Sequence, residues 1–96
     1  MAVYSLSRKA AKDIADVYEY TILNSGLDQA REYLSAMQER FQYVADHPMY
    51  GRPANELASD IRRIEYRSHV VFYLPDERGV RIIRVLHARM HASRHF

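Results

Sequence analysis

The sequence predicts an α+β fold of order β-α-α-β-β-β, in which an N-terminal strand and an αα-hairpin pack on a small antiparallel sheet. Two amphipathic helical patterns fill the first half of the chain, three strand-like runs fill the second half, and a turn-rich loop separates them. A helical hairpin needs a flat apolar surface to cover, and the strands supply one. The 96 residues suffice for one modest core, so we expect a single domain spanning residues 1–96.

Residues 2–6 form a short apolar segment that is typical of a strand. Ser7 follows where a helix N-cap is expected, because its hydroxyl can accept an early backbone N–H. Gly26 suits the position just past the end of this helix, where a positive φ is common. The apolar residues between them recur with the spacing of one helix face, at Ala10, Ile14, Val17, Tyr18 and Thr21.

A second amphipathic helix follows, and Asp28 is its expected N-cap. Pro48 disfavours helical geometry in the residue before it, so this helix must end near His47. Its apolar stripe consists of Ala30, Tyr33, Leu34, Met37, Phe41, Val44 and Ala45.

The second half contains three strand-like runs, at residues 61–67, 69–74 and 80–87. The middle run, HVVFYL, is apolar after its first residue and therefore indicates a central strand that is buried on both faces. Arg67 and Ser68 form a tight junction between the first two runs. Residues 75–79 form a hairpin connection in which Gly79 is the permissive residue.

Composition excludes several functional classes. The chain has no cysteine, so thiol chemistry and cysteine-based zinc sites are excluded. Its 3 glycines lie too far apart for a phosphate-binding loop, so we expect no nucleotide cofactor, and indeed no cofactor of any kind. The N-terminus lacks the apolar block of a signal peptide, and no segment is long and apolar enough to span a membrane. We therefore expect a cytoplasmic protein without a membrane partner.

Charge is distributed unevenly along the chain. Residues 1–50 carry 5 Lys and Arg against 7 Asp and Glu, whereas residues 51–96 carry 9 against 5, and all nine positive charges there are arginine. The planar arginine fork binds carboxylates and phosphates bidentately. The second half therefore predicts an acidic protein partner or a nucleic acid.

The C-terminal segment RIIRVLHARMHASRHF concentrates candidate chemistry. His87, His91 and His95 would share one face if this segment were helical, and histidines at i and i+4 can chelate zinc. His87, however, ends a strand pattern, and no nearby carboxylate or cysteine completes a ligand set. We therefore expect no metal site.

A metal-free ribonuclease is a second possibility for the same segment. Such an enzyme needs an acid, a base and cations for the phosphate, and His87, His91, His95 and Arg84 provide these groups. Arg84 also interrupts an apolar run, where a charge must be paired or face water. Two interpretations of Arg84 remain open: an ion pair with a carboxylate such as Glu65, or an open sheet face that meets a partner.

The chain resembles a ParE-type toxin of the ParE/RelE toxin superfamily nearly end to end. The motifs that carry the resemblance are HPMYGRP, YRSHVVFY and RVLHARM followed by RHF, in this order and at this spacing. His91 departs from the family pattern, which usually carries an aspartate there. The resemblance implies a RelE/ParE-like fold, in agreement with the element order above, and a toxin encoded with its antitoxin.

The resemblance also implies partners and sites. It implies inhibition of DNA gyrase and neutralisation by a ParD-like antitoxin in a hetero-oligomer, so that DNA is contacted only through these proteins. The RelE branch implies ribosome-dependent cleavage of messenger RNA instead, and an inactive homologue would serve only as antitoxin partner and co-repressor. The expected target-binding residues are Arg89, Met90, His91, Arg94, His95 and Phe96. The expected antitoxin-binding residues are Arg63, Arg67, Arg81, Arg84 and the partly exposed Tyr20.

Overall fold

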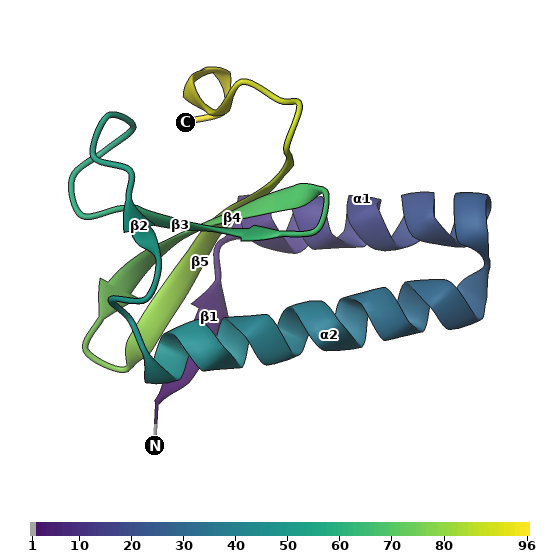
Figure 1. The fold of residues 1–96 in the computed structure, drawn as a ribbon, viewed down its shortest axis with the longest axis horizontal. Coiled ribbons are helices and arrows are strands. Elements are labelled where there is room, and N and C mark those ends of the chain that lie inside the picture. Colours follow the sequence, from purple (N-terminus) through teal and green to yellow (C-terminus); the bar gives the residue numbers. More distant parts are fainter. Residues whose placement is uncertain (1) are drawn as a thin grey trace.

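The computed structural model describes residues 2–96 and confirms the predicted α+β class. Two long helices form an antiparallel hairpin on one side of a sheet, and the C-terminal tail lies on the other side (Figure 1). The helices are α1 (Arg8–Ser25) and α2 (Leu27–Asp46), with a short 3-10 helix η1 (Ala92–Arg94) in the tail. The strands are β1 (Val3–Leu6), β2 (Arg52–Pro53), β3 (Arg62–Tyr66), β4 (His69–Asp76) and β5 (Gly79–His87).

The sheet has five strands in the order β1-β5-β4-β3-β2. The three predicted strands pair antiparallel with one another, as expected, and the short β2 extends this antiparallel part. β1 instead pairs in parallel with β5, from Val3 opposite Gly79 to Leu6 opposite Ile82, so the complete sheet is mixed. Along the chain, the whole helical hairpin comes between β1 and the other strands. It therefore supplies the long connection that a parallel pair needs.

The helix ends follow the sequence, with one correction. Ser7 caps α1 as predicted, because its Oγ accepts the Ala10 N–H at 2.9 Å. Gly26 follows α1 with φ 91°, which is also the expected conformation. Asp28, however, is not the N-cap of α2, because that helix already begins at Leu27 with Gly26 as its cap. A single glycine reverses the chain, so Asp28 falls in the first turn, where its charge still complements the helix dipole.

The main core lies between the helices and one face of the sheet. α2 contributes Met37, Phe41 and Val44, each at most 1% exposed, and they pack with sheet residues that include Tyr73 and Ile82. The prediction that β4 is buried on both faces is confirmed, because residues 70–73 are all buried. Alternate residues of β4 therefore belong to a second, smaller cluster on the far face, which consists of Ala54, Ile61, Val70, Phe72 and Leu86.

A loop and the tail with its single 3-10 turn cover the far face, and neither long helix does. Leu57 from the loop after β2 and Ala92 from the tail pack against the smaller cluster. Phe96 reaches back to Phe72, with 5.0 Å between ring centroids. None of the helices in the described part of the chain is long and apolar enough to cross a membrane.

The start of α1 closes the edge of β5 beyond the point where β1 ends. The Ser7 backbone N–H donates to the Ile82 carbonyl at 2.9 Å, and the Ser7 hydroxyl donates to the Ile83 carbonyl at 2.7 Å. Six residues later, Asp13 accepts the Val85 N–H at 2.9 Å. These bonds satisfy backbone groups that a missing strand would otherwise pair.

Candidate functional site

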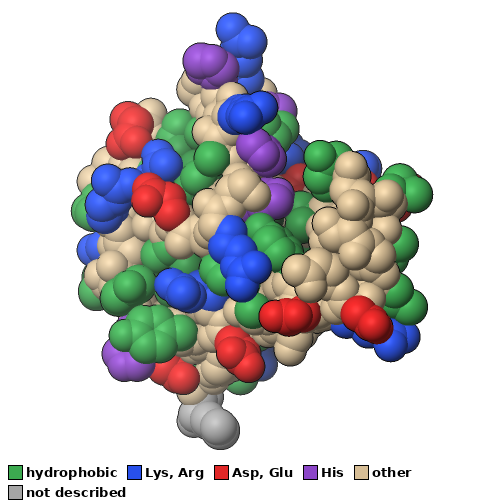
Figure 2. Space-filling model, turned by 45° about the vertical axis from the view of Figure 1, so that its right-hand side comes forward, with side chains coloured by type: hydrophobic (Ala, Val, Ile, Leu, Met, Phe, Trp, Pro, Cys, Tyr) green, Lys and Arg blue, Asp and Glu red, His purple; other side chains and the backbone are tan. Residues whose placement is uncertain are grey.

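A groove of about 670 Å³ lies between the helical hairpin and the end of the sheet. Figure 2 shows apolar and histidine side chains gathered where the helical hairpin meets the sheet, with basic and acidic side chains around them. α1 and α2 form the walls, and the ends of β4 and β5 form the floor. The residues that dominate its chemistry are Asp16, Tyr20, Glu32, Tyr33, Arg67, His69, His87 and Met90.

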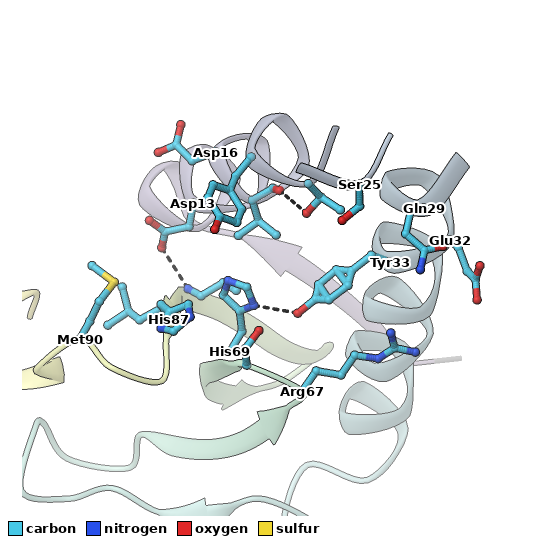
Figure 3. Close-up of a pocket in the computed structure, with 16 residues that line it drawn as sticks. Asp13, Asp16, Ser25, Gln29, Glu32, Tyr33, Arg67, His69, His87 and Met90 are labelled. Atoms are coloured by element: carbon cyan, nitrogen blue, oxygen red, sulfur yellow. Dashed lines mark hydrogen bonds between the residues drawn. The ribbon is translucent and has the colours of Figure 1, made fainter. Parts of the chain in front are cut away.

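Tyr33 and His69 form the hydrogen bond at the base of the groove. The Tyr33 hydroxyl lies 2.7 Å from His69 Nδ1, and the two side chains point toward each other from α2 and β4 (Figure 3). Burial lowers the pKa of His69, and the neighbouring His87 lowers it further. Burial also raises the pKa of Tyr33. Both groups are therefore held neutral near pH 7.

His87 lies beside His69 on the same face of the sheet. The Ala88 N–H donates to the Ser68 carbonyl at 2.8 Å, so Ser68 and Ala88 form a hydrogen-bonded pair. Because such pairs alternate along an antiparallel ladder, the next pair, His69 and His87, is not hydrogen-bonded and brings its side chains close together. Their ring centroids are 5.5 Å apart. The Arg89 N–H donates to His87 Nδ1 at 3.1 Å, which places the proton of neutral His87 on Nε2.

Arg67 forms the rim of the groove at the tight β3–β4 turn. Its backbone has φ 54°, as a two-residue junction requires. Its guanidinium lies 5.6 Å from the ring centroids of both Tyr33 and Tyr66. The groove thus combines an aromatic base, acidic side chains on its walls and one arginine on its rim, an arrangement that suits an amphipathic peptide.

The tail does not form the helix on which a three-histidine face would depend. His87 ends β5, a turn follows, and only Ala92–Arg94 is helical, as one 3-10 turn. The tail folds back because the Arg84 Nη1 donates to the His95 carbonyl at 2.7 Å and Phe96 packs on Phe72. Within residues 2–96, no group of three or more His, Cys, Asp or Glu side chains is arranged to hold a metal ion.

Arg84 forms an ion pair, but its partner is Asp13 and not Glu65. Its Nε and Nη2 donate to the two carboxylate oxygens at 2.8 and 2.9 Å, and both side chains are only 13% exposed. The hydrogen bond to Asp13 raises the pKa of Arg84. A bulge in the β4–β5 pairing leaves Ile83 without a partner, so Arg84 pairs with Phe72 and lies on the face that the tail covers, from which it reaches Asp13 in α1.

The predicted binding residues divide between different surfaces. Tyr20, Arg67 and Met90 line the groove. Arg89, His91 and Arg94 are exposed on the tail, whereas His95 is half-buried. Arg63 stacks over Phe72 on the far face of the sheet. Arg81 pairs with Leu74, so the alternation of side chains along the strands places Arg81 on the same far face. Arg84 holds the tail and α1 together.

Sequence reasoning missed the convergence of Tyr33, His69 and His87. The β3–β4 turn is the part of this arrangement that the sequence indicates. A two-residue turn at Arg67 and Ser68 places His69 opposite Tyr66. The pairing of β5 with β4 then places His87 beside His69. The position of Tyr33 over this pair depends on how the helical hairpin lies on the sheet, which no local pattern specifies.

The fold has a counterpart among solved structures. A chain described as "Chromosomal ParDE TA system from P. aeruginosa" superposes with a TM-score of 0.76 at 18% identity, covering 91% of this chain and 96% of the other. This likeness defines the class as a helical hairpin on a small sheet. Residues 4–92 match the family described as "ParE toxin of type II toxin-antitoxin system, parDE", and the chain belongs to this family.

Relatives of similar length support the assignment. "Toxin ParE1" of Caulobacter vibrioides is 41% identical over 95 residues, which cover 99% of this chain and 98% of the relative. "Toxin ParE1" of Mycobacterium tuberculosis is 33% identical over 92 residues, which cover 95% and 94%. The predicted family is thereby confirmed. The family match ends at Ala92, so Arg94, His95 and Phe96 lie beyond the matched residues.

Proposed function

We propose that this ParE-family toxin inhibits DNA gyrase and that a ParD-like antitoxin neutralises it by binding in the groove beside the helical hairpin. Family membership supports the toxin–antitoxin context. The observation that carries the proposal is the groove itself, which has about 670 Å³ of space and an aromatic base.

The exposed apolar side chains favour an amphipathic segment as the partner. Tyr20 is 67% exposed and Met90 is 41% exposed at the two sides of the groove. Aromatic residues and methionine are enriched in protein interfaces, and an amphipathic helix can bury both. Arg67 on the rim would pair with a carboxylate of the same segment.

The surface that contacts gyrase is the outward side of the tail. Arg89, His91 and Arg94 are exposed there, while His95 and Phe96 hold the tail against the sheet. Met90 belongs to both the tail and the groove. An antitoxin segment in the groove therefore covers the beginning of the tail, which gives neutralisation a direct steric cause.

The test uses the purified toxin, DNA gyrase, ATP and plasmid DNA, with supercoiling and protein-linked linear DNA as readouts. We expect the wild-type toxin to block supercoiling and produce linear DNA, and added antitoxin to suppress both effects. The variant Arg89→Ala/Arg94→Ala should lose inhibition at least ~10-fold, because it removes two charged contacts worth about 1 kcal/mol or more each.

The matched control is Arg8→Ala/Arg31→Ala, which removes the same charge from exposed positions on the two helices. It should inhibit gyrase like the wild type. A toxin that arrests growth in cells without affecting gyrase would contradict the proposed target and make messenger RNA cleavage the next activity to measure. A chain that binds antitoxin but neither arrests growth nor affects gyrase would be an inactive homologue.

A further inference from the structure

A second hollow lies on the far side of the β3–β4 hairpin turn, at the open edge of β3. β2 pairs only with the beginning of β3, at Arg62 and Arg63, and the edge is uncovered from there to the turn (Figure 1). A hollow of about 680 Å³ lies between this edge and α2. It lies on the other side of the β3–β4 turn from the groove described above.

The backbone at this edge is arranged to accept another strand. Tyr66 and His69 flank the two-residue turn and therefore form a hydrogen-bonded pair, and such pairs alternate along an antiparallel ladder. The Glu65 N–H and C=O consequently point away from β4, into the hollow. Unpaired groups of this kind bind extended peptides by strand addition.

Two arginines define the charge that fits beside this edge. Arg40 from α2 and Arg67 from the turn each place the guanidinium 5.6 Å from the centroid of the Tyr66 ring. Neither forms an ion pair with a carboxylate within residues 2–96. Glu65 also lines the hollow, but Arg52 neutralises its charge. The charges that remain beside the edge are Arg40 and Arg67 against Glu39, which is one positive charge in excess.

Tyr66 provides an independent sign that a polar partner belongs here. Its side chain lines the hollow and is only 6% exposed, and its hydroxyl is buried without a hydrogen-bond partner in the described chain. Buried hydroxyls are normally bonded, because an unsatisfied donor costs free energy.

We propose that the open edge of β3 binds an extended, acidic segment of the antitoxin, which adds to the sheet as a further strand and places a carboxylate between Arg40 and Arg67. The inference rests on the proposed function, because it takes the antitoxin as the partner. Continuity supports this choice of partner. Arg67 lines both hollows, so a chain that leaves the groove reaches the β3 edge by crossing the turn.

The first measurement is amide exchange resolved by NMR, on the wild-type toxin alone and in complex with the full-length antitoxin encoded beside it. We expect the Glu65 amide to exchange at least ~10-fold more slowly in the complex, because a free edge amide becomes hydrogen-bonded. The amides of His87 and Met90, which line the groove, report antitoxin binding independently.

The second measurement compares two substitutions at one position. Glu65→Pro removes the outward N–H, which an edge strand tolerates, whereas Glu65→Ala removes the same carboxylate and keeps the N–H. Glu65→Pro should bind antitoxin about tenfold more weakly than Glu65→Ala, with equal folding by circular dichroism. Arg40→Gln should weaken binding more than Arg40→Lys, which keeps the charge.

The outcomes separate the two proposals. Protection at the groove without protection at Glu65, together with equal affinities of the two Glu65 variants, would overturn strand addition and leave the proposed function standing. A wild-type toxin that does not bind the antitoxin would overturn both. If Glu65→Pro fails to fold, the exchange of the wild-type Glu65 amide still decides the question.

Discussion

The two faces of the sheet are covered in different ways. On one face, two long helices bury an extended apolar stripe, with Phe41 1% exposed and Tyr73 completely buried. On the other face, a loop and the tail contribute single side chains, and Phe96 remains 42% exposed although it contacts the buried Phe72. The same sheet therefore has one thickly covered face and one thinly covered face.

The difference has a physical origin. A helix satisfies its own backbone hydrogen bonds, so it can devote a continuous side-chain stripe to the core. An irregular segment must leave its backbone near water, so it covers a surface with isolated side chains. Stability should therefore reside mainly on the helix side. The thin cover can then carry the proposed gyrase-binding residues Arg89 and Arg94 at little cost to folding.

The largest effect is expected from Phe41→Ala on the helix side. This substitution empties part of the main core, and truncating a buried phenylalanine typically lowers the free energy of unfolding by about 3–5 kcal/mol. Urea unfolding followed by circular dichroism would measure the loss. A loss below ~1 kcal/mol would show that the helical face is not the main source of stability.

The second effect concerns the ion pair at the edge of β5. Asp13→Ala leaves the Arg84 guanidinium and the Val85 N–H without their partner in a mostly buried position. Removing one partner of a buried ion pair costs about 3 kcal/mol. Equilibrium unfolding measures this loss.

A double variant isolates the charge. Asp13→Ala/Arg84→Met removes both charges and should be more stable than Asp13→Ala alone, because no buried charge is left unpaired. Equal stabilities of the single and double variants would contradict the cost expected for leaving the Arg84 charge buried and unpaired.

A smaller effect is expected on the thin face. Phe96→Ala removes a partly exposed ring from Phe72 and should lower the free energy of unfolding by about 1 kcal/mol, in proportion to the apolar area it covers. The same measurement on Phe41→Ala provides the comparison. If Phe96→Ala were as damaging as Phe41→Ala, the distinction between the two faces would be wrong.

The smallest effect concerns pH. The pKa of His69 is lowered in the folded protein by burial, with His87 adding to the shift. As the pH falls, His69 therefore becomes protonated in the unfolded chain before it does so in the folded protein. The stabilising contribution of His69 is complete above about pH 6.5 and declines as the pH falls below that value. The melting temperature should fall less between pH 7.5 and 5.5 in His69→Gln than in the wild type. An equal fall would contradict this role of His69.

The hairpin junctions show how far sequence reasoning reaches. The tight turn at Arg67 and Ser68 was predictable, and with it the pairing of β3 and β4, because the two strand-like runs meet there with almost no residues between them. The carboxylate partner of Arg84 was not predictable. The bulge at Ile83 and the position of α1 decide it, and the two bonded residues lie 71 positions apart.

The order of the predicted elements, the apolar stripes, the cap at Ser7 and the family could be predicted from the amino-acid sequence, because they depend on local spacing, on backbone preferences and on motifs that can be read along the chain. The parallel pairing of β1 with β5, the meeting of Tyr33, His69 and His87, and the folding back of the tail could not be predicted in this way. These features depend on how separate elements pack. Packing is fixed by the whole set of long-range contacts and not by any one segment.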